Sequence, residues 1–197
     1  MSEEPINILL FLCQGFEDLE AVTVLDVFGW TQYREHIQKV RVTTAGFHHR
    51  VRGRFGTLAE PDLLITDIRP ARYDALVLPG GFHSHGFDEA YDARIYELAR
   101  HIHHNGGYIV TMCVGILPIA AAGLLKGRRA TTYPYSRHDN IARLQAGGAI
   151  VVDDPVVVDN RIISCRGPAA SLEVVLLLME MLMGGETVRE VRKYMLS

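Results

Sequence analysis

Cysteines are few in this sequence, and their number is odd. The 197 residues include three cysteines, Cys13, Cys113 and Cys165, spread over the whole chain. This spacing does not form the disulfide framework of a small secreted protein. The first residues are acidic and lead directly into an apolar segment, which does not fit a secretory signal peptide. We therefore expect a reducing, cytoplasmic setting.

Long hydrophobic runs and an excess of one charge are also absent. The apolar runs are shorter than the roughly 20 residues that a membrane-spanning helix needs, so no membrane contact is predicted. The formal net charge is -3 and the basic residues are scattered, which does not favour a nucleic-acid partner. The glycines have neither the dinucleotide-binding nor the P-loop spacing, so no nucleotide cofactor is implied.

Hydrophobic residues make up 48% of the chain, which is enough for a substantial core, and no repeat or linker interrupts it. We expect a single domain over residues 1–197. Among nine histidines, His83 and His85 have a spacing that could seat a metal ion. No further ligand is fixed by local spacing, so we predict no metal site and place both at the mouth of a pocket.

Apolar strand patterns alternate with helical ones. The predicted strands cover residues 6–13, 39–45, 74–78, 108–112, 130–133, 149–152, 156–158 and 161–165. The predicted helices cover 17–28, 88–104, the run before Gly123, 136–145 with Ser136 as cap, 169–183 and 187–195. Residues 48–68 are irregular, and we expect a small hairpin there that projects from the main fold. Alternation predicts an α/β fold, a three-layer α/β/α sandwich with an open, mostly parallel, flavodoxin-like sheet. Ligands bind such sheets beyond the carboxyl ends of the strands.

The stretch from Tyr108 to Gly123 is a buried strand followed by a helix, with Cys113 on the tight turn between them. Free amides and the helix dipole at such a turn favour the thiolate, the reactive form of cysteine. The alternative is a buried cysteine that acts as a small hydrophobe. Cys13 and Cys165 are expected to have only this structural role.

Two more strand ends are predicted to meet the Cys113 turn. Gly80 and Gly81 are either a simple turn or a place where backbone N–H groups approach a developing oxyanion. Glu20 is either a first-turn acid favoured by the helix dipole or a carboxylic acid beside the thiol, whose pKa burial would raise.

Five short motifs in this order resemble the PfpI/ThiJ superfamily, which has the class I glutamine-amidotransferase-like fold and includes the parkinsonism-associated deglycase. They are Gly-Phe-Glu-Asp-Leu-Glu at 15–20, Leu-Pro-Gly-Gly at 78–81, Met-Cys-Val-Gly at 112–115, Ala-Thr-Thr-Tyr-Pro at 130–134 and Arg-Gly-Pro at 166–168. The resemblance implies that Cys113 is the elbow nucleophile and that Glu20 hydrogen-bonds to its sulfur. It also implies an oxyanion site at the amides of Gly81 and Val114, and places Arg166 near the pocket.

The sequence departs from this pattern at Tyr133, where many enzymes of the superfamily have a histidine that pairs with the cysteine. A tyrosine, with a reference pKa of about 10, is a poor base near neutral pH, although it can donate a hydrogen bond or shape the pocket. If a histidine assists Cys113, the candidates are His83, His85 and His138.

The resemblance favours a cofactor-independent cysteine enzyme that acts on small carbonyl or acyl-like electrophiles, as a glyoxalase, deglycase, hydratase or peptidase-like enzyme. The alternative is a redox-responsive stress or chaperone-like protein in which Cys113 is oxidised to the sulfinate without turnover. An amidotransferase role is disfavoured, because no His-x-Glu pair follows near the C-terminal end. A small-molecule substrate and a homodimer are expected.

Overall fold

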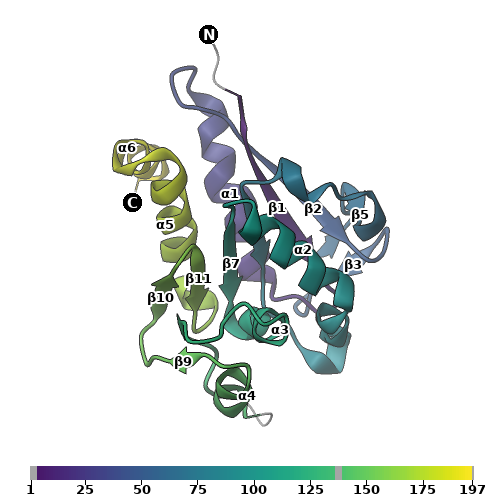
Figure 1. Cartoon of the computed structure of the whole chain (residues 1–197). Helices are drawn as coiled ribbons and strands as arrows, with labels where there is room; N and C mark the ends of the chain where they lie inside the picture. Colours follow the sequence, from purple (N-terminus) through teal and green to yellow (C-terminus); the bar gives the residue numbers. More distant parts are fainter. Residues whose placement is uncertain (1–3, 136–138, 197) are drawn as a thin grey trace.

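The computed structural model describes residues 4–135 and 139–196, and within them a seven-stranded sheet forms the centre of the molecule (Figure 1). In spatial order the strands are β10 (Val156–Asp159), β11 (Ile162–Cys165), β7 (Tyr108–Met112), β6 (Ala75–Leu78), β1 (Ile6–Leu12), β2 (Val40–Gly46) and β5 (Leu63–Leu64). All neighbours pair in parallel except β10 and β11, which are antiparallel.

Strand β1 explains why the sheet is covered on both sides. Ile8 and Leu10 belong to one hydrophobic cluster, whereas Leu9 and Phe11 belong to the other, and all four are fully buried. Successive side chains of a strand point to opposite faces, so a continuous apolar run suits a central strand between two helical layers.

Each cluster is completed by its own helices. The first contains residues of α1 (Asp18–Gly29), α5 (Ser171–Met183) and α6 (Gly185–Met195). The second contains residues of α2 (Ala93–His104), α3 (Ile116–Ala121) and α4 (Asn140–Ala146). The predicted α/β/α sandwich with a mostly parallel sheet is thus confirmed.

Two predicted helices were wrong at their ends. Residues 88–104 are not one helix: a short 3-10 helix, Phe87–Tyr91, precedes α2, and Asp92 caps α2 by accepting the Arg94 backbone N–H at 2.9 Å. Helix α4 begins later than predicted and is capped by Asp139, whose carboxylate accepts the Ala142 N–H at 3.2 Å. The predicted cap Ser136 and His138 lie outside the described residues.

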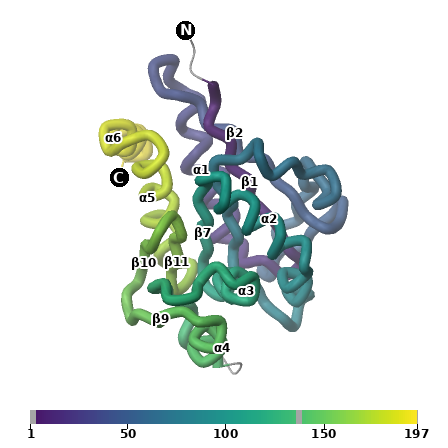
Figure 2. The backbone as a smooth tube through the Cα atoms, viewed as in Figure 1, coloured from purple at the N-terminus to yellow at the C-terminus, as the bar shows by residue number. Residues whose placement is uncertain are grey.

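Some short strands differ from the prediction as well. The segments predicted at 130–133 and 149–152 form a separate parallel pair, β8 (Arg129–Ala130) and β9 (Ile150–Val151), which does not join the central sheet. The excursion at 48–68 contains the expected hairpin, β3 (Val51–Arg52) and β4 (Leu58–Ala59), but then adds β5 to the edge of the main sheet. Figure 2 shows this excursion running along one side of the molecule.

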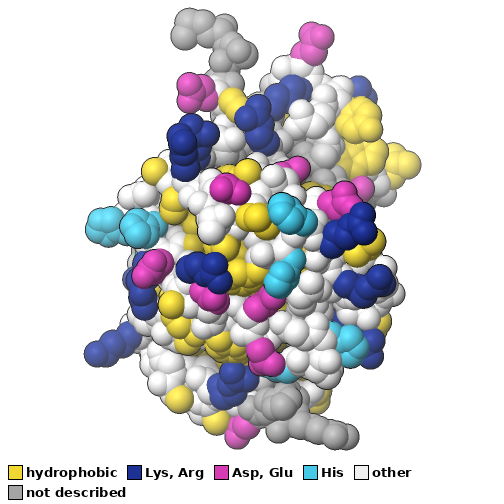
Figure 3. All heavy atoms as spheres, turned by 90° about the vertical axis from the view of Figure 1, so that its right-hand side faces the viewer, with side chains coloured by type: hydrophobic (Ala, Val, Ile, Leu, Met, Phe, Trp, Pro, Cys, Tyr) yellow, Lys and Arg dark blue, Asp and Glu magenta, His cyan; other side chains and the backbone are white. Residues whose placement is uncertain are grey.

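The charged side chains are scattered over the surface, as they are along the sequence. On the face shown in Figure 3, basic and acidic side chains are interspersed instead of forming a continuous basic area. None of the helices in the described part of the chain has the length and apolar character needed to cross a bilayer.

Candidate active site

Cys113 lies on a sharp bend directly after β7. Its φ is 53°, in the left-handed region that residues with a Cβ seldom adopt, and a 3-10 turn (Cys113–Gly115) leads from it into α3. The bend fits because its neighbours lack side chains. A Cβ on Gly80 would lie 2.7 Å from the Cys113 Cβ, and one on Gly115 would lie 2.4 Å from the Leu78 carbonyl oxygen. Both glycines therefore permit the close approach of β6 to the elbow.

The elbow opens into a cavity of about 550 Å³. Among the described residues, its walls come from six places in the chain: the residue before α1, the tip of the β3–β4 hairpin, the loop after β6, the elbow, Tyr133, Tyr135 and Asn140 around the start of α4, and Pro168 after β11. This is the carboxyl end of the parallel strands, where the alternating pattern predicts the ligand site.

Glu20 is fully buried on α1 and contacts the same backbone. Its Oε2 accepts the Gly80 N–H at 2.7 Å, whereas its Oε1 has no hydrogen-bond partner among the described residues, so the hydrogen bond to the Cys113 sulfur that the resemblance implied is not present. Burial raises the pKa of Glu20 from 4.5 to about 8, and the nearby Glu17 adds to the shift. Glu20 is therefore mainly protonated at neutral pH, and its free Oε1 is the oxygen that would carry the proton.

The expected preference of Cys113 for the thiolate is wrong in this arrangement. Burial raises the pKa of the thiol well above its usual value, and the charge of Glu20 raises it further. The backbone amide of Val114 acts in the expected direction and lowers it, but with a smaller effect. Because protonation of Glu20 removes its negative charge, the acid form of Glu20 is the one that favours ionisation of Cys113.

Glu17 is a site residue that the sequence analysis missed. It caps α1, since its Oε2 accepts the Glu20 N–H at 2.8 Å, and it also lines the cavity. Burial raises the pKa of Glu17 as well. Glu17 and Glu20 have the spacing of an N-cap and its N3 position, but glutamate is not among the preferred capping residues, so the sequence gives only a weak signal.

The two histidines after the glycine turn lie in different surroundings. His83 lines the cavity, and its Nδ1 lies 2.7 Å from the Asp88 Oδ1, while its ring stacks on Tyr91 at 5.9 Å. His85 is not among the residues that line the cavity, and its Nδ1 lies 2.8 Å from the Ser84 Oγ.

Tyr133 and Arg166 also differ in their position relative to the cavity. Tyr133 lines the cavity, and its carbonyl oxygen accepts the Asn140 Nδ2 at 3.0 Å. Arg166 does not line it; its guanidinium forms an ion pair with Asp153. Cys13 and Cys165 are buried free thiols.

The amides of Gly81 and Val114 belong to residues that line the cavity beside Cys113. An antiparallel bridge joins Gly81 to Phe16, and its two hydrogen bonds come from the N–H groups of Glu17 and Phe82. The Gly81 N–H is therefore not used by this bridge.

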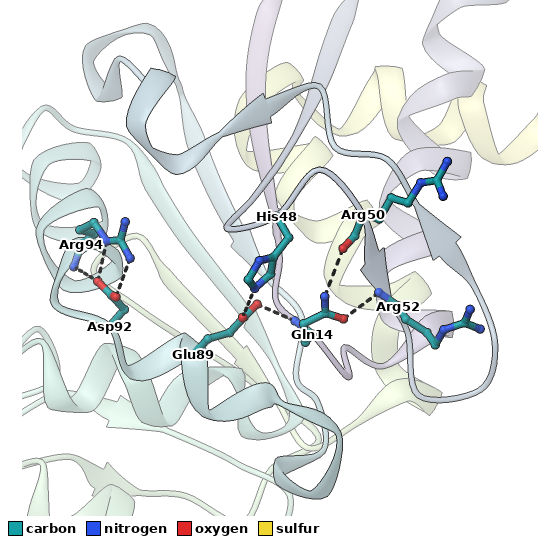
Figure 4. Close-up of polar contacts among 7 residues, drawn as sticks. All are labelled: Gln14, His48, Arg50, Arg52, Glu89, Asp92 and Arg94. Carbon is teal, nitrogen blue, oxygen red and sulfur yellow. Dashed lines mark hydrogen bonds and ion pairs between the residues drawn. The ribbon is translucent and has the colours of Figure 1, made fainter.

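A polar network holds the turn after β1 in place (Figure 4). The Glu89 carboxylate accepts the Gln14 backbone N–H at 2.7 Å and contacts the His48 Nε2 at 2.9 Å. The Gln14 side chain donates to the Arg50 carbonyl oxygen and accepts the Arg52 N–H. The network joins three wall-bearing segments, namely the β1–α1 turn, the β3–β4 hairpin and the segment after β6.

Comparison with known proteins decides the family. The sequence profile of the DJ-1/PfpI family matches residues 6–181, which is most of the chain. The chain belongs to the DJ-1/PfpI family. The resemblance seen in the sequence motifs is confirmed.

The chain is similar in sequence to several members of this family. The chain is 29% identical to Protein dj-1beta of Drosophila melanogaster over 191 residues, covering 95% of each chain. It is 31% identical to Deglycase PfpI of Pyrococcus furiosus over 164 residues, covering 83% of this chain and 91% of the relative. The crystal structure of Drosophila melanogaster DJ-1beta superposes with a TM-score of 0.83 at 27% identity, covering 98% of both chains.

The described residues contain no group of three or more His, Cys, Asp or Glu side chains placed to hold a metal ion.

Proposed function

We propose that this protein is a cysteine enzyme that acts on small carbonyl electrophiles, in the manner of a deglycase or glyoxalase. The observation that carries the proposal is that Cys113, on a strained elbow that lines a cavity, and Glu20, a buried acid whose pKa burial raises to about 8, both adjoin Gly80. Relatives named as deglycases from Pyrococcus species support this class of reaction.

The first step is addition of the Cys113 sulfur to an aldehyde carbon. The new S–C bond forms as the π electrons of the carbonyl move to its oxygen, and the thiol proton ends on that oxygen, so no external oxidant or reductant is needed. The Gly81 and Val114 amides would stabilise the negative oxygen. Glu20 would give its Oε1 proton to the oxygen and receive the thiol proton in return.

His83 is the described histidine that lines this cavity, and the Asp88 carboxylate would orient its ring. It would assist the proton transfer that the superfamily's usual histidine performs, since Tyr133 occupies that position. His83 acts in this proposal as a supplementary base.

The test is turnover of methylglyoxal or of a glycated substrate. Cys113→Ser should reduce the rate to that without enzyme, because the nucleophile is lost. Glu20→Gln keeps an acceptor for the Gly80 N–H but has no exchangeable acid proton, so kcat should fall by roughly 100-fold or more. Glu60→Gln, at an exposed glutamate outside the cavity, is the matched control and should leave kcat unchanged.

No turnover by the wild-type protein across a panel of such aldehydes would contradict the proposal. Oxidation of Cys113 without turnover would then remain as the alternative.

A further inference from the structure

We propose that the substrate carries an aromatic group next to its reactive carbonyl carbon, and that this group binds between the aromatic walls of the cavity. The inference rests on the proposed role of Cys113 as the nucleophile and names the substrate class of that same site.

The cavity has two pairs of aromatic rings. Phe55 and Phe82 meet edge to face, with ring centroids 5.7 Å apart. Tyr133 and Tyr135 form a second edge-to-face pair at 6.0 Å. Both pairs and Cys113 line the same cavity. A flat aromatic group can make offset or edge-to-face contacts with such rings, which a methyl group cannot make.

Three of these four rings are exposed. Phe55 is 67% exposed, Phe82 38% and Tyr135 83%. Covering exposed apolar surface with an apolar ligand group is favourable, so the walls gain most from a ligand that is itself apolar.

The Phe55–Phe82 wall is also held in place. The guanidinium of Arg54 lies over both rings, 5.4 Å and 5.5 Å from their centroids. The Phe55 and Thr57 backbone N–H groups each donate to the Asp18 carboxylate at 2.8 Å. Phe55 is therefore anchored to the start of α1, which also carries Glu20, and belongs to a preformed wall.

The size of the cavity favours the same ligand. A cavity of about 550 Å³ is far larger than a two- or three-carbon aldehyde requires. An aryl α-oxoaldehyde such as phenylglyoxal fills this space better than methylglyoxal.

The first experiment measures kcat/KM for phenylglyoxal and methylglyoxal. We expect a preference of at least ~10-fold for phenylglyoxal, since even one methylene in an apolar pocket is worth about 10–200-fold. Phe55→Ala should lower this ratio several-fold, and Phe55→Tyr, which keeps the ring, should restore it. Tyr33→Ala removes an aromatic residue that is 70% exposed outside the cavity and should leave the ratio unchanged.

The second experiment does not need turnover. It compares alkylation of Cys113 by 2-bromoacetophenone, iodoacetamide and iodoacetate, each relative to its rate with free cysteine, with peptide mass spectrometry to read the site. We expect selective acceleration by the aryl reagent, reduced in Phe55→Ala and Phe82→Ala.

The two experiments separate the two proposals. Selective aryl alkylation without turnover of any aldehyde would contradict the enzymatic proposal and support the aromatic site. Turnover with equal kcat/KM for both aldehydes, and alkylation ratios equal to those of free cysteine, would overturn the aromatic site alone.

Discussion

Glu20 connects the protonation of the candidate site to the stability of the fold. Burial raises its folded-state pKa to about 8, whereas the unfolded chain has a value near 4.5. The folded state therefore binds one more proton between these two pH values. The stabilisation from the protonated acid is complete below about pH 4.5 and is lost as pH rises through 8.

Glu20→Gln should therefore become progressively more stable than the wild type as pH rises. The difference in free energy of unfolding should change by up to ~1.4 kcal/mol per pH unit between pH 5 and 8, because one proton is involved. Urea denaturation at several pH values measures it, with the exposed Glu60→Gln as control. Parallel curves for wild type and Glu20→Gln would show that Glu20 titrates normally.

At the residue scale, local motifs predict the position of Cys113 and the candidacy of Glu20. They do not predict the direction of the Cys113 pKa, because burial depends on elements far apart in the chain. Phe55 was missed for the same reason. It lies on a hairpin that contacts α1 through Asp18, and the local sequence pattern does not predict that contact.

At the scale of elements, Asp18 joins α1 to the β3–β4 hairpin. Partial burial would raise the pKa of Asp18, but hydrogen bonds from the Thr57 side chain and from the Phe55 and Thr57 amides outweigh it and lower the pKa. The carboxylate is thus ionised near neutral pH, and hydrogen bonds to a charged acceptor are the stronger kind.

Asp18→Asn should loosen the hairpin tip without unfolding the protein. We expect hydrogen exchange of the Phe55 and Thr57 amides to become ~10-fold faster, corresponding to about 1.4 kcal/mol per lost charged contact. Asp26→Asn, at an exposed position on the same helix, is the control and should leave the exchange rates of these two amides unchanged. Unchanged protection in Asp18→Asn would show that the hairpin is held by other contacts.

The element boundaries show where sequence reasoning stops. Continuous apolar strands such as β1 are predicted well, because burial on both faces leaves a simple pattern. The interruption of the predicted helix at Asp92 was missed because the residues on both sides of it have a helical pattern. The hydrogen bond from the Arg94 backbone N–H to the Asp92 side chain marks where α2 begins. Strands β8 and β9 pair only with each other, a choice set by tertiary packing.

At the scale of the whole molecule, α1 has an apolar stripe on its outer side. Leu19, Val22 and Leu25 are three residues apart and are 55%, 45% and 41% exposed. Residues at this spacing share one helix face, and a second copy of the chain could bury them. We propose the homodimer expected from the superfamily on this surface.

Leu25→Glu should convert that dimer into a monomer, because it introduces a charge into an apolar contact. Size-exclusion chromatography with light scattering measures the mass of both proteins. Ile150→Glu, at a 56% exposed residue on β9, is the control and should remain dimeric. A monomeric wild type at all concentrations would exclude the dimer.

The alternation of strands and helices predicts the layered, mostly parallel architecture, but it does not fix the order of the seven strands. The addition of β5 at the edge was not predicted either, because a two-residue strand has no periodicity to detect.

Gly80 has no side chain, yet it adjoins both residues of the proposed mechanism: its N–H donates to the Glu20 carboxyl, and a Cβ on it would meet the Cys113 Cβ. The proposed nucleophile and proton donor are therefore positioned by the same backbone unit, so a shift of that unit would move both. Redesign of this site for other chemistry would have to work outward from Gly80, changing the cavity walls while leaving that unit as it is.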